Sequence, residues 1–145
     1  MAGSDPRSGP YLEPTQDVGR RYFSRRLTGP VVMLNLLRFR AVADYSATPA
    51  LAPPAAISGA AAYERYIAHT RHFLREAGGE LLFLGAGDHY LIGPPDEQWD
   101  VAMLVRHRSQ SSFLSFASNE AYLSGLGHRL AASEDSRLLP LVEQS

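Results

Sequence analysis

The most apolar run of the chain is Val31-Val32-Met33-Leu34-Asn35-Leu36-Leu37, and it decides the fold. Gly29-Pro30 precedes this run and Arg38 follows it. Its length and its β-branched start predict a buried strand rather than a helix. The amide of Asn35 lies in the middle of this strand, and burying it without partners would cost about 1–3 kcal/mol. The amide therefore either bonds to neighbouring backbone groups or points into a cavity that holds a ligand.

The composition bounds the class of protein. The chain has 145 residues, which predicts a single domain with a substantial core. Its net charge is −1, so no feature favours nucleic acid or an anionic membrane as a partner. Cysteine is absent, which excludes disulfides, thiol catalysis and cysteine-based zinc sites. We recognise neither a secretory leader nor a membrane-spanning run, and we expect a cytoplasmic protein.

Helix and strand patterns alternate after the first strand, which we place at residues 31–39. Ser58 is a good N-cap for an amphipathic helix that runs to about Ala77, where Gly78-Gly79 ends it. The remaining elements carry strand patterns or N-cap residues, and they are strands over 80–92, 100–107 and 137–142 and helical pieces after Ser109 and Asn119. The order β-α-β-β-α-β predicts an α+β, ferredoxin-like fold with a four-stranded antiparallel sheet and two helices on one face.

Two segments lie outside this pattern. Residues 1–30 are predicted to be an N-terminal extension with a short helix over 14–26, and residues 31–145 the ferredoxin-like domain. The short helix has an apolar stripe that indicates packing on the domain, made of Val18, Tyr22 and Phe23. The segment 41–57 is a long loop rich in proline and alanine, and it is either a solvated insertion or a functional loop.

The second face of the sheet also needs a cover. The strands at 31–39 and 100–107 are nearly continuous apolar runs, which is typical of strands buried on both faces. Two helices cover one face, and the simplest cover for the other is the same sheet of a second copy. The sequence therefore predicts a homodimer through the sheet face. The space between sheet and helices remains as a candidate pocket for a small organic ligand, acidic or aromatic.

Four motifs occur in order along the chain. They are Asn35-Leu36-Leu37-Arg38-Phe39, Ser58-Gly59 with Tyr63 and Tyr66, Gly93-Pro94 with Trp99-Asp100, and His128-Arg129 with Glu134-Asp135-Ser136-Arg137-Leu138. Together they resemble a bacterial family of unknown function in the dimeric α/β-barrel superfamily, over about residues 31–142. The resemblance implies a ferredoxin-like subunit that pairs sheet to sheet, with a ligand usually held between sheet and helices. The superfamily includes cofactor-free and haem-degrading monooxygenases, isomerases and lyases.

The candidate ligand-binding residues are polar or aromatic side chains predicted to reach this pocket: Asn35, Arg38, Tyr66, Trp99, His128, Arg129 and Arg137. Asn35 and His128 are the catalytic candidates. In cofactor-free oxygenases of the superfamily an Asn on the first strand helps bind an enolisable substrate, and His128 lies on a helix face of small residues, where it is suited to act as a general base. Arg129 or Arg137 is suited to clamp a carboxylate.

Each candidate also has a structural interpretation. His128 is equally suited to bond to backbone, and Tyr66 either fills the core or offers its hydroxyl to Asn35. Asp135 and Arg137 share a strand face, which favours an ion pair between helix and strand. Trp99 either lines the mouth of the pocket or packs at the dimer interface.

Three functions stay open at this point. The first is a homodimeric binding protein, the second a cofactor-free monooxygenase or isomerase that uses Asn35 and His128, and the third a non-enzymatic regulatory or assembly module. Haem degradation is weaker, because the spacing of Asn, Trp and His departs from that subfamily. We expect neither a cofactor nor a metal: Gly85-Ala86-Gly87 does not open a helix, and His69 and His72 are predicted on the outer face of their helix without a third ligand.

Overall fold

The fold is seen in a computed structural model that describes residues 10–144. Its elements in chain order are α1 (Gln16–Ser24), β1 (Val31–Phe39), the 3-10 helix η1 (Pro49–Leu51), α2 (Gly59–Glu76), β2 (Glu80–Ala86), β3 (Val101–His107), α3 (Gln110–Ala117), α4 (Glu120–Leu123), α5 (Leu126–Ala132) and β4 (Ser133–Leu141). β1 has the bounds predicted from its apolar run. Ser58 caps α2 as predicted, because its side chain accepts the N–H of Ala61.

The four strands form one antiparallel sheet in the order β2-β3-β1-β4. With α2 between β1 and β2, and α3 to α5 between β3 and β4, this order is the ferredoxin-like topology. The predicted α+β class is therefore confirmed. Asn35 lies at the centre of the sheet, where it pairs with Met103 of β3 and Leu138 of β4.

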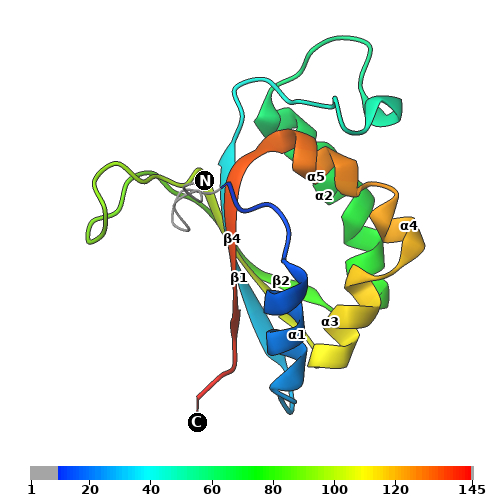
Figure 1. Cartoon of the computed structure of the whole chain (residues 1–145), viewed down its shortest axis with the longest axis vertical. Helices are drawn as coiled ribbons and strands as arrows, with labels where there is room; N and C mark the ends of the chain where they lie inside the picture. Colours follow the sequence, from blue (N-terminus) through cyan, green and yellow to red (C-terminus); the bar gives the residue numbers. More distant parts are fainter. Residues whose placement is uncertain (1–9, 145) are drawn as a thin grey trace, which may run out of the picture.

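The two faces of the sheet differ in their cover. The helices lie on one side of the sheet in Figure 1. Alternation along β1 sends Val31, Met33 and Leu37 toward the helices, and all three are buried. The alternate side chains Val32, Leu34 and Leu36 face the other way, where no helix of residues 10–144 lies over the sheet. We call this second side the open face, and it carries a row of four apolar residues in register, which are Phe83, Leu104, Leu34 and Leu139.

Several predicted boundaries differ from those observed. β2 ends at Ala86 instead of residue 92, so residues 87–99 form a long hairpin that we call the arm. β4 begins at Ser133 instead of residue 137. The last helical region consists of three pieces rather than two, because Asn119 caps α4 and Gly125 separates it from α5. A Cβ at Gly125 would lie 2.2 Å from the His69 ring, so this break brings the chain close to α2.

The N-terminal extension packs on α3 through two of its three predicted contacts. Tyr22 and Phe23 meet the ring of Phe113, at centroid distances of 6.4 Å in both cases. Val18 is exposed and takes no part. Among the described residues, none of the helices combines the length and hydrophobicity that a bilayer crossing requires.

Candidate functional site

Asn35 and Tyr66 are predicted partners, but the structure pairs each with another group. The Asn35 Nδ2 donates to the Met33 carbonyl at 3.3 Å, so the amide bonds to its own strand. The Tyr66 hydroxyl lies 2.7 Å from the hydroxyl of Tyr122 on α4. The buried cluster beneath the helices contains both tyrosines together with Tyr63, Met103 and Phe116. Aromatic side chains thus occupy the part of the predicted pocket near Tyr66.

His128 on α5 bonds to the loop 41–57. Its Nδ1 lies 2.7 Å from the Tyr45 hydroxyl, and the two rings meet edge to face. Burial, together with the charges of Arg65 and His69, lowers the pKa of His128, so the imidazole is neutral at neutral pH. The contact connects α5 to the long loop, and it gives His128 a different partner from Asn35.

Arg38, Trp99 and Arg137 are the predicted residues that the structure brings together. The guanidinium carbon of Arg38 lies 5.4 Å from the Trp99 ring centroid, and that of Arg137 lies 5.0 Å from the same ring. Both arginines lie on the open face, because Arg38 alternates with Leu36 and Arg137 pairs with Leu36. The indole is buried, and both cations are attracted to its ring. This cluster lies where β1 ends, on the opposite face from the predicted pocket.

One buried carboxylate, Asp135, holds both arginines. Its Oδ1 accepts from Arg137 Nη1 at 2.7 Å, and its Oδ2 lies 3.4 Å from Arg38 Nη2. The N–H groups of Tyr11 and Ser136 also donate to Oδ1. Burial alone would raise the pKa of Asp135, but these hydrogen bonds and the Arg137 charge outweigh it, so the pKa lies below its ordinary value. The predicted Asp135–Arg137 ion pair thus lies within one strand rather than between helix and strand.

A cavity of about 280 Å³ adjoins the cluster, and its lining residues are Pro10, Arg38, Arg40, Glu134 and Asp135. Arg38 also approaches the Glu134 carboxylate, at 3.9 Å. Arg40 differs, because within residues 10–144 it has no ion pair and its buried Nε has no hydrogen-bond partner. Two further carboxylates act on these arginines from outside the cavity lining, because Glu97 attracts Arg137 and Arg38, and Asp44 attracts Arg40. Among the described residues Arg40 is nevertheless the guanidinium group of this region without a direct ion pair.

Arg40 is the residue that the sequence reasoning misses. Its only signal is its position two residues after Arg38, since alternation along an extended chain places both side chains on one face. Glu134 and Asp135 belong to the motif that begins at His128, but their pairing with Arg38 depends on the register of β4 against β1.

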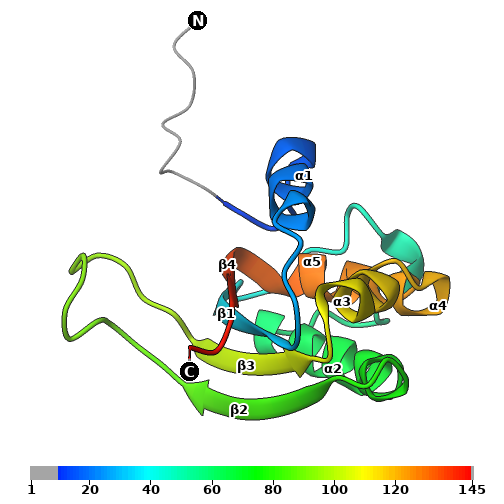
Figure 2. The same ribbon diagram turned by 90° about the horizontal axis from the view of Figure 1, so that it is seen from below.

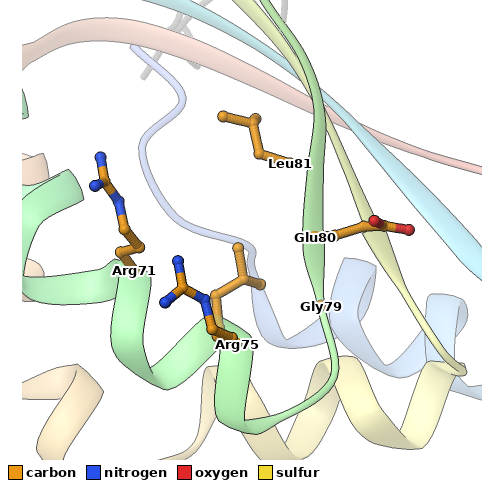
Figure 3. Close-up of a pocket in the computed structure, with 6 residues that line it drawn as sticks. Arg71, Arg75, Gly79, Glu80 and Leu81 are labelled. Carbon is orange, nitrogen blue, oxygen red and sulfur yellow. The ribbon is translucent and has the colours of Figure 1, made fainter.

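A second cavity, of about 360 Å³, lies between the end of α2 and the start of β2 (Figure 3). Figure 3 shows Arg71 and Arg75 reaching from α2, with Glu80 directed away from them. The Glu80 carboxylate instead lies 3.4 Å from Arg106. None of the predicted site residues lines this cavity.

Two further predicted positions have other contacts. Arg129 Nη1 donates to the Leu12 carbonyl at 3.0 Å, so it holds the segment before α1. His69 does not lie on the outer face of α2, because its Nε2 is 2.9 Å from the carbonyl of Ala121 on α4. Within residues 10–144 no group of three or more His, Asp or Glu side chains is placed to hold a metal ion.

The chain is similar to solved structures. Crystal structures of the RPA0582 protein, one of them of its methylated form, match with TM-scores of 0.82 and 0.83 at 31% identity. These matches cover 93–94% of this chain and 96–99% of RPA0582, a protein of unknown function from Rhodopseudomonas palustris. A candidate antibiotic biosynthesis monooxygenase from Caulobacter crescentus CB15 matches with a TM-score of 0.50 at 10% identity, over 86% of this chain and 99% of that one, which shows the fold alone. We find no match among protein-family models or curated proteins.

Proposed function

The chain belongs to the family of the RPA0582 protein of Rhodopseudomonas palustris, and within that family we propose that it is a homodimer that binds a small organic acid. The observation that carries the proposal is Arg40, a guanidinium group that lines a cavity without a carboxylate partner among the described residues. The acid binds in that cavity, at the end of the open face, and not between sheet and helices.

The open face supports the homodimer. Phe83 and Leu139 at the two ends of its apolar row are 57% and 53% exposed. Contiguous exposed apolar surface of this kind marks an interaction site in a soluble protein. A second copy offers the same row, and a two-fold axis brings identical patches together.

The unpaired guanidinium group of Arg40 selects the class of ligand. A guanidinium group forms two parallel hydrogen bonds with a carboxylate, and Arg40 and Arg38 line the same cavity. A carboxylate of the ligand gives Arg40 the direct ion-pair partner that it lacks among the described residues. The volume of about 280 Å³ lies just below the usual range of about 300–1,000 Å³ for ligand sites, which favours an acid of few atoms. An aromatic ring on the ligand would add little affinity, because two arginines already lie over the Trp99 ring on which it could stack.

Acid–base catalysis by Asn35 and His128 is outside this proposal. The Asn35 amide bonds to the Met33 carbonyl, and His128 bonds to Tyr45. A general base must come within hydrogen-bond reach of the group from which it takes a proton. Binding without chemistry needs only the arginines and the cavity.

The proposal is tested by titrating the protein with acetate, pyruvate and benzoate, and with acetamide and benzamide as neutral controls. At least one acid should bind with a Kd of about 1 mM or tighter, and the amides should not bind. Arg40→Gln removes a charge-assisted pair and should weaken binding about 10- to 100-fold. Arg71→Gln, in the second cavity, is the matched control and should bind as the wild type does. Equal affinity of Arg40→Gln, or no binding of any acid, would contradict the proposal.

A further inference from the structure

The arm projects from the sheet on the side opposite the helices. Figures 1 and 2 show residues 87–99 extending away from the molecule, from between β2 and β3. Leu91 is 100% exposed and Ile92 is 92% exposed, so its most distant part carries two bare aliphatic side chains. In the described chain no other large apolar residue is exposed to this degree.

The base of the arm is held by hydrogen bonds. Gly87 N–H donates to the Asp100 carbonyl at 3.0 Å, and Trp99 N–H donates to the Asp88 carbonyl at 3.1 Å. A Cβ at Gly87 would lie 2.6 Å from the Trp99 carbonyl oxygen, so the two sides of the base are in close contact.

Consecutive hydrogen bonds between side chains continue from that base into the arm. The Trp99 Nε1 donates to the Tyr90 hydroxyl at 2.6 Å, and that hydroxyl donates to the Glu97 carboxylate. This hydrogen bond from Tyr90 lowers the pKa of Glu97, so the carboxylate stays ionised at neutral pH. Trp99 in turn lies against Arg38 and Arg137. Trp99 thus connects the base of the arm to Arg38, which lines the proposed binding cavity.

The area of the open face lies near the lower limit for a stable dimer. Four strands of about 4.8 Å width, seven or nine residues long, give a flat footprint of roughly 500 Å². A stable interface buries about 800 Å² or more per partner. The arm is the element on the same side of the sheet that adds apolar surface to this face.

We propose that the arm of each subunit closes over the second copy and buries Leu91 and Ile92 against it. This proposal rests on the homodimer proposed above. The charge of the arm agrees with a protein partner: it contains Asp88, Asp96 and Glu97 and no arginine or lysine, whereas all 14 basic residues lie elsewhere in the chain. An anionic lipid surface would repel such an arm, whereas an arginine-bearing copy of this chain attracts it.

The lack of native cysteine allows a direct test. Leu91→Cys and the control Val42→Cys, in the loop 41–57, each receive one environment-sensitive fluorophore. As the protein concentration rises, the emission of the label at position 91 should shift to shorter wavelength, and the label should become protected from quenching by iodide. The midpoint of both changes should equal the midpoint of dimerisation measured by sedimentation. The label at position 42 should not respond. The double substitution of Leu91 and Ile92 by serine should weaken dimerisation at least about 10-fold, and Val42→Ser should leave it unchanged.

The outcomes separate the two proposals. A dimer that forms with position 91 accessible to iodide, and with unchanged affinity in the serine variant, overturns the arm contact and leaves the homodimer standing. A wild-type protein that stays monomeric overturns both. An acid that binds while the protein stays monomeric would keep the ligand site and remove the arm contact.

Discussion

At the scale of single residues, His107 at the end of β3 is a buried titratable group. Its ring lies between Phe113 and Phe116, at centroid distances of 5.0 and 5.6 Å. Its Nδ1 is buried without a hydrogen-bond partner among the described residues. Burial lowers the pKa of His107 from 6.5 to about 4, because the charged imidazolium would lose its hydration. The side chain therefore acts as a neutral part of the core.

This lowered pKa predicts a loss of stability in mild acid. In the unfolded chain His107 takes up a proton below about pH 6.5, whereas in the folded protein it stays neutral until about pH 4. The unfolded state binds more protons in this window, so the free energy of unfolding should fall as the pH is lowered through it. Between pH 7 and pH 5 the expected loss is about 2 kcal/mol. Urea denaturation at a series of pH values measures it.

A variant isolates the contribution of this histidine. His107→Leu removes the titrating group and keeps an apolar side chain in place, so the loss of stability between pH 7 and pH 5 should shrink by about 2 kcal/mol. His128, whose pKa burial also lowers, keeps its own contribution to the slope. His72→Asn is the control, since His72 is exposed on α2, where its only ion-pair partner among the described residues is Glu76, and its removal should not flatten the slope. A wild-type slope that persists in His107→Leu would show that the acid sensitivity arises elsewhere.

The residues of the site show what local sequence can predict. Arg38, Trp99 and Arg137 are identifiable as isolated polar or aromatic positions, and they do form one cluster. Their common partner Asp135 depends on strand register, because Arg38 meets it only through the pairing of β4 with β1. The spacing of Arg40 from Arg38 indicates a shared face, but the cavity beside it depends on the register shift that leaves Glu134 of β4 unpaired. Long-range register therefore separates the predicted residues from the observed site.

At the scale of elements, Gly59 lies where β1, α2 and α5 meet. Its N–H donates to the Arg40 carbonyl at 3.0 Å, and the Arg40 N–H donates to the Ala132 carbonyl at 2.8 Å. A Cβ at Gly59 would lie 2.3 Å from the Arg40 oxygen and 2.6 Å from the Ala132 oxygen. Only a residue without a side chain allows the start of α2 to come this close to two backbones.

Gly59→Ala should therefore destabilise the protein, although alanine favours helices. The added methyl group must displace backbone atoms, and overpacking of this kind costs about 1–3 kcal/mol. Gly19→Ala is the matched control, because nothing lies within 4 Å of its Cβ position in α1. That change should be neutral or stabilise by up to about 1 kcal/mol. Thermal denaturation measures the stability of both variants. An unchanged Tm for Gly59→Ala would contradict this packing.

The elements differ in how far the sequence predicts them. β1 and α2 carry a long apolar run and a clear helical period, and their observed bounds agree closely with those predicted. β4 starts earlier than its apolar pattern, because the polar residues Ser133 to Asp135 pair with the end of β1. The helical region before β4 divides at Gly125, where the chain approaches His69. Tertiary contacts, rather than local preference, set these boundaries.

Tertiary contacts also explain why the predicted convergence of Asn35 and His128 is not observed. The helix face of small residues on which His128 is predicted to lie assumes one continuous helix, whereas the structure has α4 and α5 with a break between them. Tyr45, from a loop that has no periodic pattern, supplies the partner of the imidazole. Neither the break nor this partner follows from hydrophobic periodicity.

At the scale of the whole molecule, the homodimer predicts a clear effect of one charge on the open face. Leu139→Glu places a carboxylate in the apolar row, where each subunit would bury it against the other without a partner. The dimer Kd should rise at least about 100-fold, equivalent to about 3 kcal/mol. Sedimentation at several protein concentrations measures this Kd.

The monomer should stay folded, because Leu139 is 53% exposed. Leu114→Glu, at 47% exposure on α3, should dimerise normally. A Leu139→Glu protein that dimerises as the wild type does would rule out this face as the interface.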